Sequence, residues 1–210
     1  MSTVFVHLGV SQDGYMAGPN RGVSTPMGEG AHAIHDWVFE QRTFRQALKL
    51  GDGGETGADN ALLEHTFARI GANIMGKRMF DEGEASWPEE APFHNPVFVL
   101  THEQRKPWPR PGGTTFYFVN DDLHTVLAKA REAAGEKDVR ISGGGDIVAQ
   151  YLNAGLVEEL RLDLSPVLLG AGLRLFDAVD PQRVKLQLAE VTSSPRVTHL
   201  EYSVSSPSTS

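Results

Sequence analysis

The chain has 210 residues, of which 40% are hydrophobic and 22% are charged, a balance typical of a globular domain. Lys and Arg number 19 against 27 Asp and Glu, and this formal charge of -8 excludes nonspecific binding of nucleic acid through a basic surface. There is no cysteine, which excludes disulfides, thiolate metal sites and a cysteine nucleophile. No apolar run approaches the roughly 20 residues that cross a bilayer, and residues 1–10 lack a signal-peptide pattern. We therefore expect a cytoplasmic protein with no membrane partner.

Strands and helices alternate over the first two-thirds of the chain. Short apolar runs predict strands at residues 4–10, 72–75, 96–101, 114–119 and 139–142. Apolar side chains at helical spacing predict helices at residues 32–50, 59–70, 121–134 and 147–152. Between them we expect a long, Gly- and Pro-rich loop at residues 11–30 and an acidic surface loop at residues 80–95. Long ordered loops are often functional.

The last third of the chain is dominated by strands. Long strands are predicted at residues 157–169, 184–191 and 198–204, joined by turns that contain Gly and Pro. We therefore expect a single α/β domain over residues 1–204, with a mixed central sheet that is parallel in its core and antiparallel at its C-terminal strands. Residues 205–210 are low in complexity and are expected to be a frayed tail.

Two strand-to-helix junctions have the composition of phosphate sites. At the first, a strand runs through Met75 into Gly76, and Lys77 and Arg78 follow at a helix start. Free N–H groups at a helix N-terminus and nearby cations both favour an anion, although paired surface cations are also common without a ligand. This junction does not match the phosphate-loop pattern that ends in Gly-Lys-Ser/Thr.

The second junction carries three consecutive glycines, Gly143, Gly144 and Gly145, between Ser142 and Asp146. Without Cβ atoms the backbone can approach a ligand closely and adopt positive φ angles. A tight strand-to-helix turn needs fewer glycines, so we favour a ligand-binding role. The spacing does not match Gly-x-Gly-x-x-Gly, and a standard dinucleotide fingerprint is therefore absent.

Other candidate chemistry is less specific. Asp13 follows the first strand and precedes Gly14, a pair that is also typical of a plain turn. His32 and His35 lie three residues apart on one predicted helix, but no further cluster completes a ligand set, so we predict no metal site. No Gly-x-Ser-x-Gly elbow of a serine hydrolase is present.

Four segments together resemble the dihydrofolate reductase-like superfamily, and within it the riboflavin-biosynthesis reductase C-terminal domain family. In chain order they begin with Ser11-x-Asp13-Gly14 followed by Ala17-Gly18-Pro19, and continue with Met75-Gly76-Lys77-Arg78 and Ser142-Gly143-Gly144-Gly145. The last is Leu156-Val157-Glu158-Glu159-Leu160, which leads to Ser165-Pro166-Val167-Leu168-Leu169-Gly170. The resemblance spans residues 4–204, and residues 28–57 form an insertion typical of an actinobacterial branch.

The resemblance implies a dihydrofolate reductase-like fold and an NADPH-dependent reductase, with NADH not excluded. It implies that Ser142 and Gly143 to Gly145 pass under the pyrophosphate, that Gly76, Lys77 and Arg78 meet phosphates, and that Val10 and Ala17 flank the nicotinamide. Thr101 and His102 would lie against the adenosine and its 2′-phosphate. Asp146 stands where some relatives place a cation for that phosphate, and an acid there would repel it, which weakens the case for NADPH over NADH. Met79 stands where dihydrofolate reductases usually offer a hydroxyl group to the pyrophosphate.

The same resemblance implies a substrate that is a small pteridine- or pyrimidine-like heterocycle. Hydride transfer requires aligned donor and acceptor carbons and one proton. Asp36 is at roughly the place of the substrate-binding carboxylate of dihydrofolate reductase, and Asp13 is the other carboxylate near the nicotinamide end. Either could bind a ring amidine or assist protonation with a pKa raised by burial, with Trp37 beside them. Asp36 could equally be a residue stabilised by the helix dipole.

We therefore expect a reductase with 5-amino-6-(5-phosphoribosylamino)uracil reductase activity, which belongs to riboflavin biosynthesis, or with dihydrofolate reductase-like activity. One alternative is a catalytically silent nucleotide-binding sensor, since no proton donor is unambiguous. Another is a flavin-using relative, since Trp37 could stack on an isoalloxazine ring. The C-terminal edge strands predict a homodimer, because an exposed apolar edge is otherwise an aggregation hazard.

Overall fold

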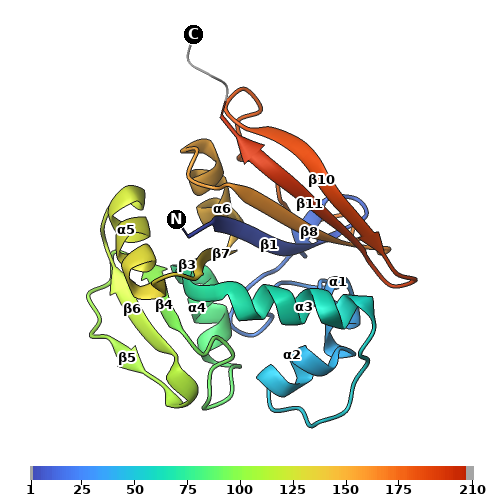
Figure 1. The fold of residues 1–210 in the computed structure, drawn as a ribbon, viewed down its shortest axis with the longest axis horizontal. Coiled ribbons are helices and arrows are strands. Elements are labelled where there is room, and N and C mark those ends of the chain that lie inside the picture. The colour runs from blue at the N-terminus through green and yellow to red at the C-terminus, as the bar shows by residue number, and fades with distance from the viewer. Residues whose placement is uncertain (1, 207–210) are drawn as a thin grey trace.

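A twisted sheet of nine strands forms the centre of the molecule (Figure 1). The computed structural model of the chain describes residues 2–206. Its strand order is β10-β11-β8-β1-β7-β3-β4-β6-β5. The strands are β1 (Val4–Ser11), β3 (Ile70–Gly76), β4 (Pro96–Leu100), β5 (Trp108–Pro109), β6 (Thr115–Val119), β7 (Asp138–Gly143), β8 (Glu159–Ser165), β10 (Lys185–Ser193) and β11 (Thr198–Ser205). A separate two-stranded sheet pairs β2 (Tyr15–Ala17) with β9 (Leu173–Arg174).

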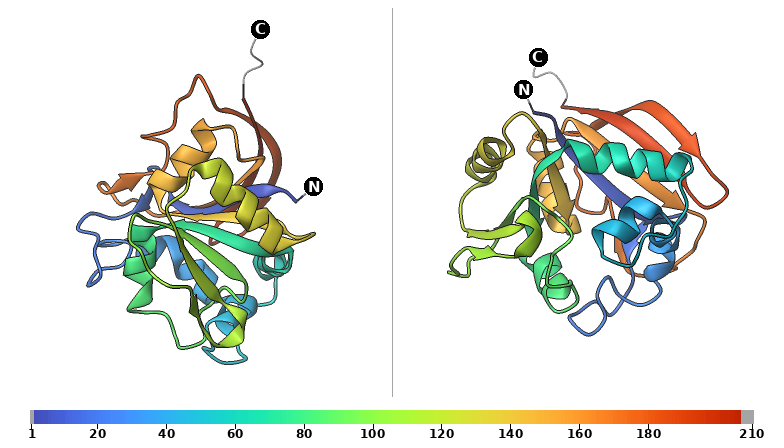
Figure 2. Two further views of the ribbon diagram at one scale, coloured as in Figure 1. Left: turned by 90° about the vertical axis from the view of Figure 1, so that its left-hand side faces the viewer. Right: turned by 60° about the horizontal axis from the view of Figure 1, so that its bottom comes forward.

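Helices cover both faces of the sheet (Figure 2). They are α1 (His32–Phe39), α2 (Arg42–Ala47), α3 (Ala58–Arg69), α4 (Lys77–Glu84), α5 (Leu123–Ala134) and α6 (Gly145–Asn153), with a short 3-10 turn at Pro111–Gly113. Alternation along β1 and β7 points Val4, Val6, Val139 and Ile141 to the face that α5 and α6 cover, where the largest apolar core forms. The opposite face carries α1, α3 and α4.

That opposite face has two smaller apolar cores and a polar centre. Phe80 of α4 packs with Met75, Val97 and Phe116 over β3, β4 and β6. Trp37 and Val38 of α1 pack with Leu63 of α3 and with Val197 at the β10–β11 turn. The strands β1, β7 and β8 between these cores present His7, Arg140 and Asp163 instead of apolar side chains. The middle of this face is therefore polar.

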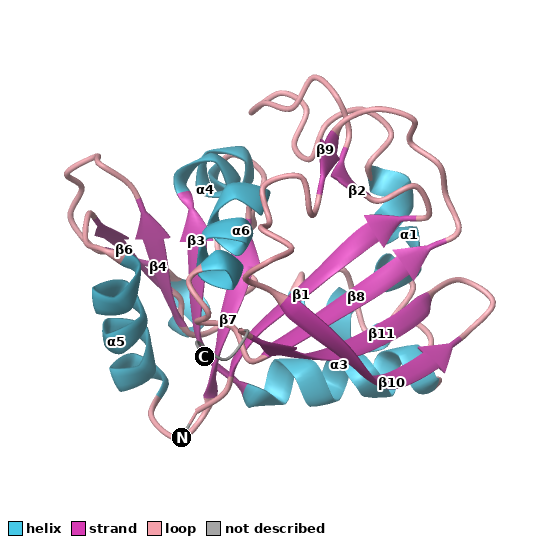
Figure 3. Cartoon of the chain, turned by 90° about the horizontal axis from the view of Figure 1, so that it is seen from above, coloured by secondary structure: helices cyan, strands magenta, loops and turns pink. Residues whose placement is uncertain are grey.

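The six strands β8, β1, β7, β3, β4 and β6 are parallel, whereas β11 pairs antiparallel with β8 and β10 antiparallel with β11. The predicted fold class, a single α/β domain with a parallel core and antiparallel C-terminal strands, is therefore confirmed. Within residues 2–206 no helix has the length and apolar character that a membrane crossing requires. Figure 3 shows the parallel strands ending at one common edge, where several loops gather.

The structure corrects four predicted boundaries. The helix expected over residues 32–50 is two helices, because Gln41 is extended and the chain pairs there with Glu55. The loop expected at residues 80–95 begins as α4, which the buried Phe80 anchors. The strand expected over residues 157–169 ends at Ser165. Of the tail expected at residues 205–210, Ser205 belongs to β11, and residues 207–210 lie outside the described part of the chain.

Candidate functional site

The two glycine-bearing junctions lie side by side at the carboxyl edge of the sheet. Strands β3 and β7 are parallel neighbours, and Met75 is in register with Gly143. A Cβ atom built on Gly76 would stand 3.8 Å from the backbone nitrogen of Gly144 and 2.8 Å from Ile147 of α6. Ligands of open parallel sheets bind at this edge. The structure therefore brings together the segments that the sequence singled out separately.

At the second junction, the glycine backbone faces open space on the side of the loop that contains Arg21. Gly143 has φ of 126°, which favours glycine, and its peptide bond to Gly144 is cis. A Cβ atom on Gly144 would meet only the Nη2 atom of Arg21, at 3.9 Å. At Gly145, by contrast, a Cβ would stand 3.1 Å from the sulfur of Met16. Gly144 is thus the point of the junction with the most open space above it.

Two helices begin at this edge without a side-chain cap. The N-cap residues of α4 and α6 are Gly76 and Gly144, and neither helix has a side chain that accepts a hydrogen bond from its first N–H groups. The helices α1, α2 and α3 also lack a side-chain cap, whereas Asp122 caps α5 by accepting hydrogen bonds from the backbone of His124 and Thr125. Uncapped N–H groups at a helix N-terminus favour an anion. Two such termini converge here.

The predicted cations of the first junction differ from each other. The Nζ atom of Lys77 lies 2.5 Å from Asp81 and 3.1 Å from Glu103, and the hydrogen bond to Asp81 raises the pKa of the lysine. Arg78 is exposed and forms no ion pair within residues 2–206. A phosphate at α4 would therefore meet Arg78 directly, but would compete with two carboxylates for Lys77.

Arg21 is a cation at this edge that the sequence interpretation missed. Its guanidinium is the nearest group to the open side of Gly144 and forms an ion pair of 3.0 Å with Glu82 of α4. Glu82 also accepts a hydrogen bond from the backbone of Met27 and so fastens the loop of residues 18–30 to α4. Arg21 is the only Lys or Arg between Ser11 and Gln41, and this isolation was the available signal.

The remaining nucleotide-site predictions fall along the same edge. Val10 lies near the end of β1 and Ala17 in β2, and both are buried. Thr101 and His102 directly follow β4, where the ring of His102 is exposed and lies 2.7 Å from the side chain of Asn120. Asp146 is exposed in the first turn of α6. The side chain of Ser142 is buried and donates a hydrogen bond to the side chain of Asn73 at 2.7 Å.

Asp13 holds two loops together. Its carboxylate accepts hydrogen bonds from the Ser11 hydroxyl at 2.6 Å and from the backbone N–H groups of Leu169 and Gly170 at 3.1 and 2.7 Å. These donors lower the pKa of Asp13 to about 2, and the hydrogen bond from the Ser11 hydroxyl is the largest cause. The expectation of a pKa raised by burial is therefore wrong for Asp13. A carboxyl group with so low a pKa is a poor proton donor at neutral pH.

We predict that Asp13→Ala frees the loop around Leu169 and Gly170, because both N–H groups lose their acceptor. Hydrogen–deuterium exchange of these two amides should accelerate, whereas Asp52→Ala, in an exposed loop, should leave them unchanged. Since the folded pKa of Asp13 is depressed, the wild-type protection should persist above the ordinary value of 3.8 and fade as the pH falls toward about 2. Unchanged exchange in the variant would show that Asp13 does not hold this loop.

The predicted substrate residues of α1 do not share one environment. Asp36 is exposed and makes no side-chain hydrogen bond within the described residues. Trp37 is 4% exposed and packs edge-on against His199, with ring centres 5.1 Å apart. The expectation that Trp37 stacks on a ligand is therefore not met by this structure, because its side chain is buried. Its neighbour His35, which was considered only as a metal ligand, lies against Gly9 of β1.

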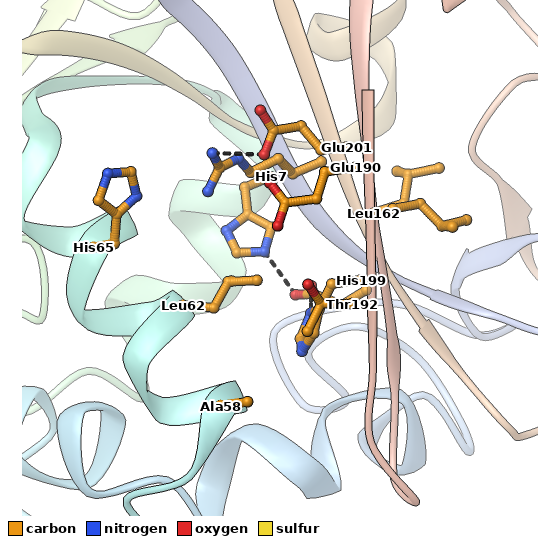
Figure 4. Close-up of a pocket in the computed structure, with 12 residues that line it drawn as sticks. His7, Ala58, Leu62, His65, Leu162, Glu190, Thr192, His199 and Glu201 are labelled. Carbon is orange, nitrogen blue, oxygen red and sulfur yellow. Dashed lines mark hydrogen bonds and ion pairs between the residues drawn. The ribbon is translucent and has the colours of Figure 1, made fainter. Parts of the chain in front are cut away.

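A cavity of about 240 Å³ lies on the same sheet face, between α3 and strands β8, β10 and β11 (Figure 4). Ala58, Leu62 and His65 line it from α3, opposite His7 and His199 on the sheet. The carboxylates of Asp163, Glu190 and Glu201 also line it, with Arg161 as the one Lys or Arg among its lining residues. The cavity is smaller than the about 300–1,000 Å³ of typical ligand pockets, and its acidic lining repels phosphates. It is not a dinucleotide site.

A buried ionic cluster forms the floor of this cavity. Asp163 lies 2.8 Å from Nε2 of His7 and 2.6 Å from Nδ1 of His199, and Nε2 of His199 lies 3.2 Å from Asp59. Burial alone would raise the pKa of Asp163, but the two histidines outweigh it and lower the pKa well below its ordinary value. Burial alone would lower the pKa of His199, yet Asp163 and Asp59 raise it. Among residues 2–206 no set of three or more His, Asp or Glu side chains is arranged to hold a metal ion.

Comparison with known proteins assigns this architecture. One curated relative, the uncharacterized protein YyaP of Bacillus subtilis, is 36% identical over 86 residues, which is 40% of this chain and 45% of YyaP. A putative riboflavin biosynthesis protein from Shewanella sp. PV-4 superimposes with a TM-score of 0.65 at 19% identity, covering 96% of this chain and 98% of that one. Dihydrofolate reductase from Enterococcus faecalis, complexed with NADP(H) and RAB-propyl, gives a TM-score of 0.53 at 10% identity, covering 98% of this chain and 96% of that one.

The structural matches lie below 25% identity and therefore support the fold alone, which is dihydrofolate reductase-like. The match to YyaP spans less than half of that protein and carries no assigned activity. The model of the RibD C-terminal domain family is more extensive and matches residues 2–200. The chain belongs to the RibD C-terminal domain family.

Proposed function

We propose that the chain is a reductase that uses NADPH or NADH to transfer a hydride to a small pteridine- or pyrimidine-like heterocycle. The observation that carries this proposal is the meeting of Gly76 and Gly144 at one edge of the sheet, each at the start of a helix without a side-chain cap. The open side of Gly144, where a Cβ atom would meet only Arg21, supports a close approach of a pyrophosphate to the backbone. Membership in the RibD C-terminal domain family supports the same conclusion.

In this proposal each segment has a separate task. Gly143 to Gly145 and the first N–H groups of α6 bind the pyrophosphate, while Gly76 and Arg78 bind phosphate at α4. Arg21 lies next to Gly144 and adds positive charge there, although its ion pair with Glu82 neutralises part of this charge. Val10 and Ala17 flank the nicotinamide, which supplies the hydride when it is bound. The chain itself must hold the acceptor ring in line and exclude water.

The preference between NADPH and NADH depends on opposing charges around the adenosine end. His102 and the exposed Arg78 favour a 2′-phosphate, whereas Glu103, Asp81 and Asp146 oppose it. We propose NADPH as the cofactor, with Thr101 and His102 beside the 2′-phosphate. The proposed activities are reduction of 5-amino-6-(5-phosphoribosylamino)uracil, as in riboflavin biosynthesis, and a dihydrofolate reductase-like reaction.

A nucleotide-binding sensor without catalysis is the second candidate. It is favoured by the lowered pKa of Asp13, which removes one of the two proposed proton donors. Asp36, which is exposed on α1, remains as a proposed substrate carboxylate. A flavin-using relative lacks the stacking surface proposed for it, because Trp37 is buried.

The test is cofactor binding followed by turnover. We expect NADPH to raise the melting temperature of the purified protein and to bind more tightly than NADH. We then expect the absorbance of NADPH to fall when a pyrimidine or pterin substrate is added. Binding without turnover across both substrate classes would select the sensor, and no binding of either nicotinamide cofactor would contradict the proposal.

We further propose that the protein is a homodimer that joins through β10. Every residue of this edge strand is at least partly exposed, and Leu186, Leu188 and Val191 are 41%, 53% and 51% exposed. In the β10–β11 hairpin these three residues lie opposite apolar residues of β11 and share one face with them. The pairs are Leu186 with Val204, Leu188 with Tyr202 and Val191 with Leu200. An edge strand with such a face can pair with a second copy about a two-fold axis.

Leu188→Glu should convert the dimer to a monomer, because a carboxylate at the centre of this apolar strip would be desolvated in the dimer. Light scattering at micromolar protein should then give the mass of one chain. Leu50→Glu, which replaces an exposed leucine after α2, is the matched control and should remain dimeric. A wild-type protein that scatters as a monomer would contradict the proposed dimer.

A further inference from the structure

Arg140 of β7 is a partly buried arginine whose Nε atom is fully enclosed and which has no carboxylate partner within residues 2–206. Three other arginines have side chains only 12–16% exposed, and each forms an ion pair: Arg21 with Glu82 at 3.0 Å, Arg69 with Asp138 at 2.6 Å and Arg161 with Glu159 at 2.5 Å. Arg140 forms none within residues 2–206. A guanidinium removed from water is costly unless an anion pairs with it. Arg140 therefore departs from the pattern of the rest of the molecule.

The hydrogen bonds of Arg140 are incomplete. Nη2 donates to the backbone oxygen of His7 at 2.9 Å. Nε is buried and has no acceptor, and Nη1 donates to no group in the described part of the chain. Burial lowers the pKa of Arg140 to about 10, and the charge of Asp163 offsets only part of this effect. An acceptor on a bound ligand would satisfy the remaining N–H donors of the guanidinium.

The position of Arg140 connects it to the candidate nucleotide site. Arg140 is in register with Phe5 of β1 and with Asn73 of β3, at the centre of the parallel sheet. Ser142 lies two residues further along β7 on the same face, and the open glycine junction begins directly after it. The α4 core and the α1–α3 core cover this face on either side. The guanidinium thus lies on the sheet between these two cores, and we place it next to the end where the proposed nicotinamide would lie.

His35 provides a second, independent observation. A Cβ atom on Gly9 would stand 2.8 Å from Cε1 of His35, so the absence of a side chain on β1 is what admits this ring to the sheet. Neither ring nitrogen forms a hydrogen bond within the described residues. Burial is the main cause that lowers the pKa of His35, and the nearby Arg140 lowers it further, so the ring is neutral and can donate one N–H.

We infer that Arg140 and His35 form a subsite that binds an anionic oxygen of the substrate, either a carboxylate on the heterocycle or a phosphate on a group attached to it. This inference rests on the proposed function, because it places the subsite at the acceptor end of the nicotinamide. A guanidinium and a neutral N–H both donate, and neither can accept from a protonated amidine. The preferred substrate is therefore an oxygen-bearing, negatively charged heterocycle and not a cationic one.

The experiment measures ligand binding without turnover. The protein, saturated with NADPH, is titrated with benzoate, phenyl phosphate and benzamidine, and binding is followed by calorimetry and by the shift in melting temperature. We compare the wild type with Arg140→Met, Arg140→Lys and the control Arg131→Met, which removes an exposed arginine paired with Glu158. Arg140→Met should fold, because an apolar side chain of similar volume replaces a partly buried charge that has no ion-pair partner within residues 2–206.

Benzoate or phenyl phosphate should bind to the wild type and to Arg131→Met, and at least tenfold more weakly to Arg140→Met, with partial recovery in Arg140→Lys. The tighter of the two anions identifies the carboxylate or the phosphate as the natural group. Equal binding of both anions to the wild type and Arg140→Met, absence of anion binding, or preferred binding of benzamidine would overturn the inference. Because NADPH affinity is measured first in each variant, loss of the cofactor site and loss of the anion subsite are distinguished.

Discussion

Replacing Gly144 with alanine is expected to weaken NADPH binding at least about tenfold, or about 1.4 kcal/mol, without unfolding the protein. The added methyl group has room in the free protein, since its nearest neighbour is Arg21 at 3.9 Å, and the φ of Gly144 is -68°. The same methyl group would fill the space through which a pyrophosphate reaches the backbone. Calorimetric titration with NADPH, together with a thermal melt, measures both effects.

Gly53→Ala is the matched control for this variant. A Cβ atom on Gly53 meets nothing within 4 Å, and the residue lies in an exposed loop away from the carboxyl edge. Its NADPH affinity should equal that of the wild type. If Gly144→Ala binds NADPH as tightly as the control does, then the glycine junction does not contact the cofactor.

Replacing Asp163 with asparagine is expected to destabilise the fold by about 3–5 kcal/mol, the usual cost of removing one partner from a buried ionic group. Asp163 is 6% exposed and lies between His7 and His199, so its loss leaves two buried imidazoles without their common carboxylate. Chemical denaturation at neutral pH measures the change in the free energy of unfolding. Asp180→Asn, which removes an exposed partner of Arg183, should change it by less than about 1 kcal/mol.

The cluster also fixes the direction of the pH dependence. The pKa of Asp163 is depressed in the folded state, so its contribution is present above the ordinary value of 3.8 and is lost as the pH falls through the folded pKa. The pKa of His199 is raised, so its contribution is fully present below 6.5 and is lost as the pH rises through the folded pKa. In Asp163→Asn both slopes should flatten. Slopes identical to the wild type would show that other groups control them.

The sequence was sufficient to predict the alternation of strands and helices along the chain and the edge of the sheet at which the candidate site lies. Parallel strands end at one edge by geometry, so two glycine-bearing junctions on neighbouring strands had to lie near each other. Local patterns were sufficient for α5, where Asp122 caps the first turn and Gly135 ends the helix. They failed at Gln41, because a contact with Glu55, far along the chain, breaks the helix there. Such a contact leaves no periodic signal.

The polar centre of the sheet could not be predicted for a related reason. Arg140 meets His7 only because β1 and β7 pair in parallel with a particular register, and 133 residues separate the two along the chain. His35 reaches the sheet only because Gly9 lacks a side chain at the point where α1 crosses. In the sequence Asp36 and Trp37 looked equally suitable as ligand contacts. Which of three adjacent residues faces the sheet depends on the docking of α1, and this is set by tertiary packing.

The most direct test of the central proposal is a crystal structure of the protein with NADPH. We predict a single dinucleotide that crosses the carboxyl edge, with its pyrophosphate between Gly76 and Gly144 and its nicotinamide toward Val10. Electron density for the cofactor in the acidic cavity beneath α3, or a protein that binds NADPH with neither glycine junction in contact, would contradict the account.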